Sequence, residues 1–228
     1  MPRFAANLTM MFNEVPFLDR FDAAARAGFT AVEFLFPYDH PAEAIGERLH
    51  RNGLTQALFN LPPGNWDAGE KGFAALPDRF ADLQQSLRTA LPYALATGVK
   101  RVHLMAGIAS RGDPKAVDAF RKSVAAAAEF FAPHGLDVVI EPINSRNVPG
   151  YFLNEFTFAR DLILQAGIPN LKLQFDIYHC QIIHGDVTMR LREMLPTIGH
   201  IQIASIPSRN EPDGEDLNYP FLFDELYR

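Results

Sequence analysis

Short apolar runs alternate with longer segments of helical periodicity along the whole chain. The apolar runs cover residues 3–8, 30–36, 54–59, 101–105, 136–141, 171–176 and 200–205. A helical segment after every apolar run predicts parallel strands joined by right-handed crossover connections, because two parallel strands cannot be joined by a tight turn. The sequence therefore predicts an α/β protein built from repeated strand–helix units.

The segments between the runs have the start and stop signals of helices. A proline near the first turn and a glycine at the end mark the helices predicted over 15–28, 41–53 and 114–135. Side chains suited to N-capping precede two more helices, Asn154 before 155–167 and Asp186 before 187–199.

Two architectures fit such a repeat, a closed eight-stranded barrel and an open doubly wound sheet. An open nucleotide-binding sheet usually has a glycine-rich turn after its first strand, whereas here that turn reads TMMFNEVP. We therefore predict a (β/α)8 TIM barrel, as a single domain over residues 1–228, and no nucleotide cofactor. A complete barrel typically needs about 250 residues, and FLFDELYR at the end reads as the start of the seventh helix. The eighth strand and helix are expected to lie outside these residues.

Charge and composition exclude several classes of protein. The 21 Lys and Arg against 27 Asp and Glu give a net charge of −6, which argues against nucleic acid as a partner. The sequence has neither the apolar core of a signal peptide at its start nor a membrane-spanning stretch, which takes about 18 apolar residues. Cys180 is the only cysteine, so an intrachain disulfide is excluded, and it is expected to be a packed small residue. These features predict a soluble, cytoplasmic protein, and they leave open whether it forms a homo-oligomer.

A polar residue lies at or near the end of every predicted strand. These residues are Asn7, Glu33, Asn60, His103, Glu141, Asp176 and Gln202. Strands of a barrel core are normally almost entirely apolar, and burying an ionised carboxylate costs free energy unless it is paired or binds a metal. Because the carboxyl ends of all barrel strands meet at one mouth, these side chains are expected to share a site there.

The strongest candidates are Glu141, Asp176 and Gln202, at the ends of three successive strands. Their ligand atoms are all hard oxygens, which suit Mg²⁺ or Mn²⁺. The two carboxylates could instead cap the following loops or pair with arginines. Because all three occur in step at consecutive strand ends, we favour a divalent metal site.

Other candidates each have a plain structural alternative. His179 could contact substrate or pack beside Tyr178, and Arg209 could bind a substrate carboxylate or be solvated in its loop. The segment 60–72 is either a lid or surface packing around Trp66, and Met10–Phe12 either shields the pocket or contacts another subunit.

The chain resembles the hydroxypyruvate isomerase family, within the xylose-isomerase-like TIM barrels. The resemblance runs along essentially the whole chain and rests on RFAANLTMMFNE, VEFLFPYD, FNLPPGNWDAGEKG, IEPIN, PGYFLN, LQFDIYH and HIQIASIPSRNEPDGEDLNYP. It implies that Glu141 is both a metal ligand and a proton-transferring catalytic residue. It also implies that Asp176 and Gln202 are further ligands and that His179 and Arg209 lie near the substrate, as Asn7, Asn60 and His103 are expected to do from their strand-end positions.

The implied reaction interconverts hydroxypyruvate and tartronate semialdehyde through an enediol, with metal-assisted proton transfer by paired glutamates. The family has the second glutamate in a segment like GCEYKP on strand eight, and no such segment occurs in these residues. The alternatives are a 2-oxo-tetronate isomerase or ketose epimerase with the same machinery, and a catalytically defective barrel that acts as a binding protein. Metal-dependent phosphodiester cleavage is disfavoured by the net charge of −6 and by too few histidines for a multi-zinc site.

Overall fold

Every pair of neighbouring strands is parallel in the computed structural model, which describes residues 2–226. The strands are β1 Ala5–Asn7, β2 Ala31–Glu33, β3 Thr55–Gln56, β4 Phe59–Asn60, β5 Arg101–His103, β6 Asp137–Ile140, β7 Leu171–Asp176 and β8 Ile198–Gln202. They form a three-stranded sheet in the order β1-β2-β3 and a five-stranded sheet in the order β4-β5-β6-β7-β8. The α/β fold with parallel strands, predicted from the strand–helix repeat, is confirmed.

The two sheets are continuous through the third predicted strand. The run predicted at 54–59 is divided into β3, which pairs with β2, and β4, which pairs with β5. Across the division, the backbone N–H of Phe34 donates to Leu58 O at 3.4 Å and that of Asn60 to Leu35 O at 2.8 Å. The strand thus changes partners as the barrel wall curves, and this division cannot be read from its hydrophobic pattern.

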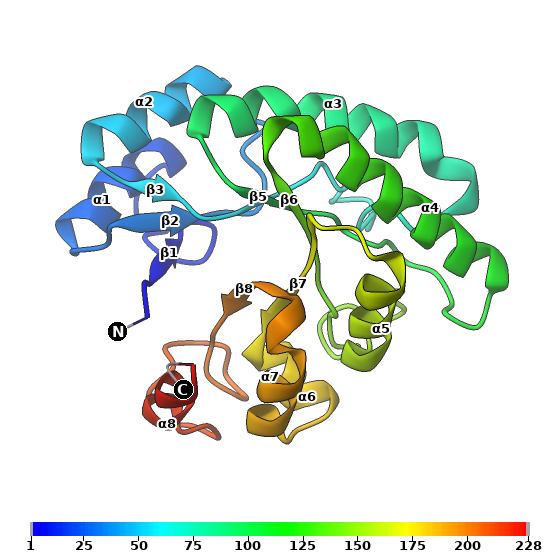
Figure 1. Ribbon diagram of the computed structural model, residues 1–228. Helices are drawn as coiled ribbons and strands as arrows, with labels where there is room; N and C mark the ends of the chain where they lie inside the picture. The colour runs from blue at the N-terminus through cyan, green and yellow to red at the C-terminus, as the bar shows by residue number, and fades with distance from the viewer. Residues whose placement is uncertain (1, 227–228) are drawn as a thin grey trace.

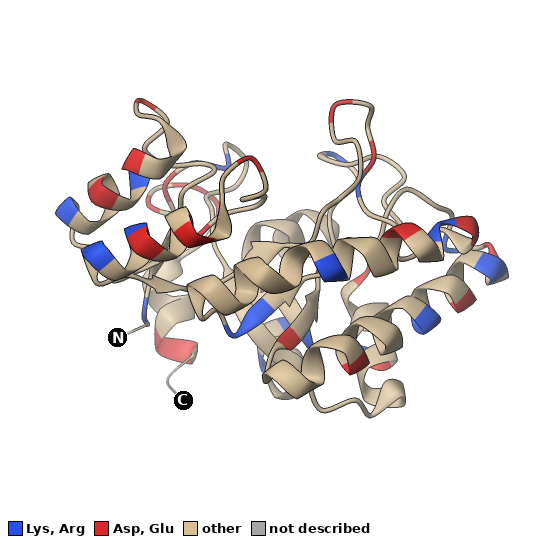
Figure 2. Ribbon diagram, turned by 90° about the horizontal axis from the view of Figure 1, so that it is seen from above, with Lys and Arg blue, Asp and Glu red and all other residues tan. Residues whose placement is uncertain are grey.

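The helices surround the strands on the outside of the curved sheet (Figure 1). They are α1 Arg20–Arg26, α2 Ala42–Asn52, α3 Phe80–Thr97, α4 Pro114–Phe131, α5 Phe156–Ala166, α6 Ile177–Ile183, α7 Val187–Met194 and α8 Tyr219–Glu225. Acidic and basic residues are interspersed along the outer helices (Figure 2). The last helix, α8, lies beside the start of the chain, where the rings of Phe4 and Phe223 are 5.2 Å apart.

The N-terminal ends of α5 and α7 differ in how their predicted caps are used. The N-cap of α5 is Glu155 instead of Asn154, because its two carboxylate oxygens accept hydrogen bonds from the backbone N–H groups of Thr157 and Phe158 at 2.8 and 2.7 Å. Asp186 precedes α7 as predicted, but its backbone is left-handed (φ 48°) and its side chain makes no capping bond.

The region after β7 holds a helix that is not among the predicted ones. Helix α6 begins directly after Asp176, whose Oδ1 accepts from the backbone N–H of Tyr178 at 2.8 Å. The next helix, α7, then ends at Met194, five residues before the predicted end, and a 3-10 turn over Leu195–Thr197 leads into β8. Because α6 starts at a strand end, it places its first turn at the barrel mouth.

The core lies between the strands and the surrounding helices. It includes large side chains with no exposed surface, such as Phe120, Phe156 and Phe175, and the rings of the last two are 5.0 Å apart. Among residues 2–226, no helix has the length and apolar character needed to cross a membrane. The prediction of a single domain over 1–228 stays a prediction.

Candidate metal and acid–base site

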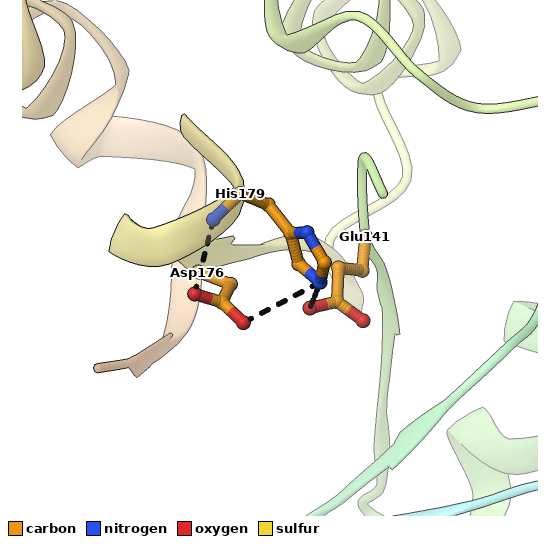
Figure 3. A group of neighbouring side chains, drawn as sticks. All are labelled: Glu141, Asp176 and His179. Atoms are coloured by element: carbon orange, nitrogen blue, oxygen red, sulfur yellow. Dashed lines mark hydrogen bonds and ion pairs between the residues drawn. The ribbon is translucent and has the colours of Figure 1, made fainter. Parts of the chain in front are cut away.

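Three side chains converge at the carboxyl ends of β6 and β7. Glu141 directly follows β6, Asp176 ends β7, and His179 lies in the first turn of α6. Figure 3 shows the imidazole of His179 directed at both carboxylates, with its Nε2 3.9 Å from Glu141 Oε1 and 3.6 Å from Asp176 Oδ2. Ligand atoms of all three residues lie within 4.8 Å of one another, and all three are buried. This spacing is small enough for one cation to contact several of them.

Asp176 uses its two carboxylate oxygens differently. Oδ1 caps α6, accepting from the backbone N–H groups of Tyr178 at 2.8 Å and His179 at 3.4 Å. Oδ2 faces the imidazole instead. The capping alternative raised by the sequence is therefore seen, but it occupies one oxygen and leaves the other directed into the cluster.

The electrostatics of Glu141 fit a cation. Burial raises the pKa of Glu141 well above its usual value, and the neighbouring Asp176 raises that pKa further, against the opposing influence of Arg209 and Gln174. Two buried carboxylates this close disfavour each other's ionised form. A divalent cation would relieve that repulsion, and the oxygen atoms of the pair suit Mg²⁺ or Mn²⁺.

Gln202 lies beside the cluster, in a second polar group. It is paired in register with Asp176, and its Nε2 donates to Glu33 Oε1 at 2.6 Å while its Oε1 accepts from Gln174 Nε2 at 2.8 Å. Glu33 also accepts from Asn7 Nδ2 at 3.0 Å, and its Oε2 lies 2.7 Å from the Nε2 of His200. Burial alone would raise the pKa of Glu33, but these partners outweigh burial and lower it.

The remaining predicted site residues differ in what they contact. Arg209, with left-handed backbone (φ 59°), has Nη2 3.4 Å from His179 Nε2, and its guanidinium lies 4.7 Å from the Tyr178 ring centre. His103 Nδ1 is 3.7 Å from Glu141 Oε2. Asn60 is buried, and its amide Nδ2 lies 3.9 Å from the sulfur of Met105.

The loops predicted to cover the site are partly exposed. Trp66 packs on Phe36 with ring centres 5.1 Å apart, and Lys71 Nζ lies 3.3 Å from its ring centre. Met10 and Met11 are 55% and 39% exposed. Whether these residues form a lid, a pocket wall or a subunit contact stays a prediction. Cys180 is buried, and burial raises the pKa of its thiol to about 12, which disfavours a nucleophilic thiolate.

Four polar residues of this region were given no role by sequence reasoning. Glu33 stood out as a polar strand end, whereas Gln174, His200 and Asn144 did not stand out at all. Gln174 and His200 each precede a candidate ligand by two residues, so the alternation of a strand places them on the same face as Asp176 and Gln202. Asn144 follows β6 in an irregular loop, where no periodicity indicates the direction of a side chain.

His103 is a buried, neutral imidazole. Neither of its ring nitrogens has a hydrogen-bond partner within residues 2–226, and burial, with His179 and His200 nearby, lowers its pKa to about 3. At neutral pH its contact with Glu141 is therefore not an ion pair. A buried side chain with unused hydrogen-bonding atoms beside the cluster is suited to binding a polar ligand.

This depressed pKa predicts a specific acid sensitivity. Below about pH 6.5 the unfolded chain protonates His103 and the folded chain does not, so stability is lost as pH falls toward about 3. We expect His103→Asn to reduce this loss by up to about 1.4 kcal/mol per pH unit, the value for one proton. Urea unfolding from pH 7 to 4 measures it, with the exposed His134→Asn as the control. Superimposable slopes for wild type and His103→Asn would refute this assignment.

Comparison with known proteins identifies the family. Residues 21–228 match the family described as the xylose isomerase-like TIM barrel. The chain is 54% identical to the 2-oxo-tetronate isomerase of Cupriavidus necator over 99% of this chain and 88% of that protein. It is 40% identical to the hydroxypyruvate isomerase of Escherichia coli over 98% and 87%. A crystal structure described as AP endonuclease, family 2, from Brucella melitensis superposes with a TM-score of 0.97 at 48% identity, covering 100% and 88%. The predicted resemblance is thus confirmed, and the chain is an isomerase that belongs to the xylose isomerase-like TIM barrel family, together with hydroxypyruvate and 2-oxo-tetronate isomerases.

Proposed function

We propose that the protein catalyses a metal-assisted shift of a carbonyl between adjacent carbons of a small hydroxy-oxo acid, with a 2-oxo-tetronate as the preferred substrate. The observation behind the proposal is the pair of buried carboxylates, Glu141 and Asp176, at the barrel mouth of a chain 54% identical to a 2-oxo-tetronate isomerase. Hydroxypyruvate, which the sequence resemblance placed first, is the second candidate, because identity to a hydroxypyruvate isomerase is 40%.

The reaction needs a group that removes and returns a proton. Removal of a proton from the hydroxyl-bearing carbon, with protonation of the carbonyl oxygen, gives an enediol. Return of a proton to the former carbonyl carbon, with loss of the proton from the original hydroxyl, completes the shift without an oxidant or reductant. Glu141 is proposed as a proton carrier, because its carboxyl lies in the cluster at the barrel mouth and because burial and Asp176 raise its pKa well above the usual value, which makes it a better proton acceptor than an ordinary carboxylate. A positioned group of this kind typically contributes about 10²–10⁴ in rate.

Glu141, Asp176 and Gln202 are proposed to hold a divalent cation, Mg²⁺ or Mn²⁺. When bound, it would supply Lewis-acid stabilisation of the negative charge that develops on the substrate oxygens. Asp176 offers Oδ2, since Oδ1 caps α6. The carboxylate of Glu33, which accepts from Gln202 Nε2, orients that amide so that its carbonyl oxygen faces away from Glu33 and toward Gln174.

The neutral and cationic groups around the pair are proposed to bind the substrate. Arg209, adjacent to His179, is suited to the substrate carboxylate through its guanidinium. His103 and Asn60 have hydrogen-bonding atoms left for hydroxyl and carbonyl oxygens. Asn7 donates to Glu33 and accepts from the backbone N–H of Thr9. It is therefore proposed to support the substrate-binding residues without contacting the substrate itself.

Turnover of a panel of substrates tests the proposal. The full-length protein with Mg²⁺ or Mn²⁺ is assayed with hydroxypyruvate, a 2-oxo-tetronate and a six-carbon ketose. We expect the highest kcat/KM for the four-carbon acid and a lower value for hydroxypyruvate. Exclusive turnover of the six-carbon ketose would favour an epimerase, and no turnover of any of them would favour the binding-protein alternative.

A further inference from the structure

The two ring nitrogens of His179 face different partners. Its Nε2 faces the carboxylates of Glu141 and Asp176, and its Nδ1 faces Asn144, which has no exposed surface. A neutral imidazole has a proton on one nitrogen and a lone pair on the other, and only the nitrogen with the lone pair can bind a metal. The partner of Nδ1 therefore decides what Nε2 can do in the site.

The orientation of the Asn144 amide is set by its other contact. Its Oδ1 accepts from the backbone N–H of Asn147 at 2.9 Å, so the amide nitrogen is on the opposite side. That nitrogen, Nδ2, lies 2.6 Å from His179 Nδ1. The backbone N–H of Asn144 also donates to the same ring nitrogen, at 3.3 Å. If the amide were reversed, Nδ2 would face the N–H of Asn147, donor against donor.

Both groups that reach Nδ1 are donors, so Nδ1 must accept. We infer that Asn144 is a positioning residue that fixes His179 as the Nε2–H tautomer, which makes His179 a hydrogen-bond donor at the reaction centre and not a metal ligand. The cation then depends on oxygen ligands, and His179 is left to hold an oxygen of the substrate. The catalytic part of this inference rests on the proposed function, whereas the tautomer itself does not.

One contact opposes this assignment and is weaker. Arg209 Nη2 lies 3.4 Å from His179 Nε2, and donation there would require a lone pair on Nε2. This contact is longer than either contact to Nδ1, and the guanidinium also stacks on the Tyr178 ring. The contacts also indicate a neutral ring, since an imidazolium would direct a proton at the two donors on Nδ1.

A neutral donor beside the carboxylates suits the proposed reaction. The developing enediolate needs hydrogen bonds to its oxygens, and a group that donates without first gaining a proton can supply one. The Nε2–H of His179 faces Glu141, the proposed proton carrier, across 3.9 Å. A substrate oxygen beside Glu141 would lie within reach of this donor.

The tautomer is directly measurable. In long-range ¹H–¹⁵N correlation spectra of the full-length, metal-free protein with ¹⁵N-labelled histidine, a protonated ring nitrogen and one with a lone pair have clearly different shifts. His179→Gln identifies the His179 signals among the seven histidines. We expect Nε2 to be protonated and Nδ1 to have the lone pair, with no change when Mg²⁺ is added. A protonated Nδ1, with or without Mg²⁺, would overturn the inference.

Two matched substitutions test the role of Asn144. Asn144→Asp replaces the donor with an acceptor of nearly the same shape, so Nδ1 of His179 is expected to become protonated. Asn147→Asp is the control in the same loop, because its side chain accepts from Tyr178 Oη at 3.0 Å and an aspartate would still accept. If Asn144→Asp left the Nε2–H signal of His179 unchanged, Asn144 would not be the group that sets the tautomer.

The kinetic consequence separates this inference from the proposed function. Asn144→Asp is expected to lower kcat by about 10–100-fold, the range typical of residues that orient a site from behind, and Asn147→Asp is expected to change it little. Absence of isomerase activity in wild type would refute the proposed function while leaving the NMR result intact. Full activity in an Asn144→Asp protein whose tautomer has switched would refute the catalytic part of the inference alone.

Discussion

Replacing Glu141 with glutamine is expected to lower kcat for the isomerisation by about 10²–10⁴-fold, the usual contribution of a positioned proton carrier. Glutamine keeps the shape of the side chain and one carbonyl oxygen, but it cannot accept a proton from carbon. It also removes one of the two buried carboxylates whose proximity raises the pKa of Glu141. The variant is therefore expected to fold at least as stably as wild type in the absence of metal, so that loss of activity and loss of stability are separated.

Steady-state kinetics with the proposed four-carbon substrate, together with thermal unfolding, check this prediction in the full-length protein. Glu193→Gln is the matched control, because Glu193 is an exposed carboxylate that pairs with Arg160 on the outer surface. The same change of residue there should leave kcat within about twofold, since surface substitutions cost little. A Glu141→Gln enzyme with wild-type kcat would rule out Glu141 as a proton carrier.

Removal of divalent metal is expected to abolish most of the activity, with restoration by Mg²⁺ or Mn²⁺. Lewis-acid stabilisation supplies several kcal/mol, which corresponds to at least about 10²-fold in rate. Metal binding should also stabilise the fold, by about 2.7 kcal/mol when the free metal is about 100 times Kd. The gain would arise because a cation held by the proposed ligands relieves the repulsion between Glu141 and Asp176 in the folded state.

The substitution Asp176→Asn distinguishes the proposed metal-binding role of Asp176 from its role as the cap of α6. Asparagine retains an oxygen that can accept from the backbone N–H of Tyr178, so α6 should remain capped. The charge is lost, so the rise in melting temperature on adding Mg²⁺ should shrink or disappear. If EDTA leaves activity unchanged, or if Asp176→Asn keeps the full thermal gain, a metal bound by Asp176 would not take part in the reaction.

The arrangement of strands and helices could be predicted because it depends on local periodicity. The apolar runs and the proline and glycine signals at helix ends lie within a few residues of each other, so they can be read along the chain. The candidate residues Glu141, Asp176 and His103 were found for a similar reason. Charged and polar groups are unusual at the ends of buried parallel strands, and the geometry of a barrel brings those ends to one mouth.

Structural details that depend on one carboxylate group, or on a change of strand pairing, could not be predicted from the sequence. The third strand is divided into β3 and β4 where the wall curves, and α6 begins where one oxygen of Asp176 caps its first turn. A sequence shows that Asp176 can be a ligand or a cap, but it does not show that the two oxygens divide these roles.

The composition, the strand–helix repeat and the strand-end carboxylates are properties of the chain itself, and they suffice for the fold class and for a candidate acid–base pair. The state of each polar group depends on partners far away along the chain. Gln202 is oriented by Glu33, 169 residues earlier, and His179 by Asn144, 35 residues earlier. A hydrogen bond needs its two atoms placed to within a few tenths of an ångström, and only the folded tertiary structure places residues so distant in sequence with that accuracy.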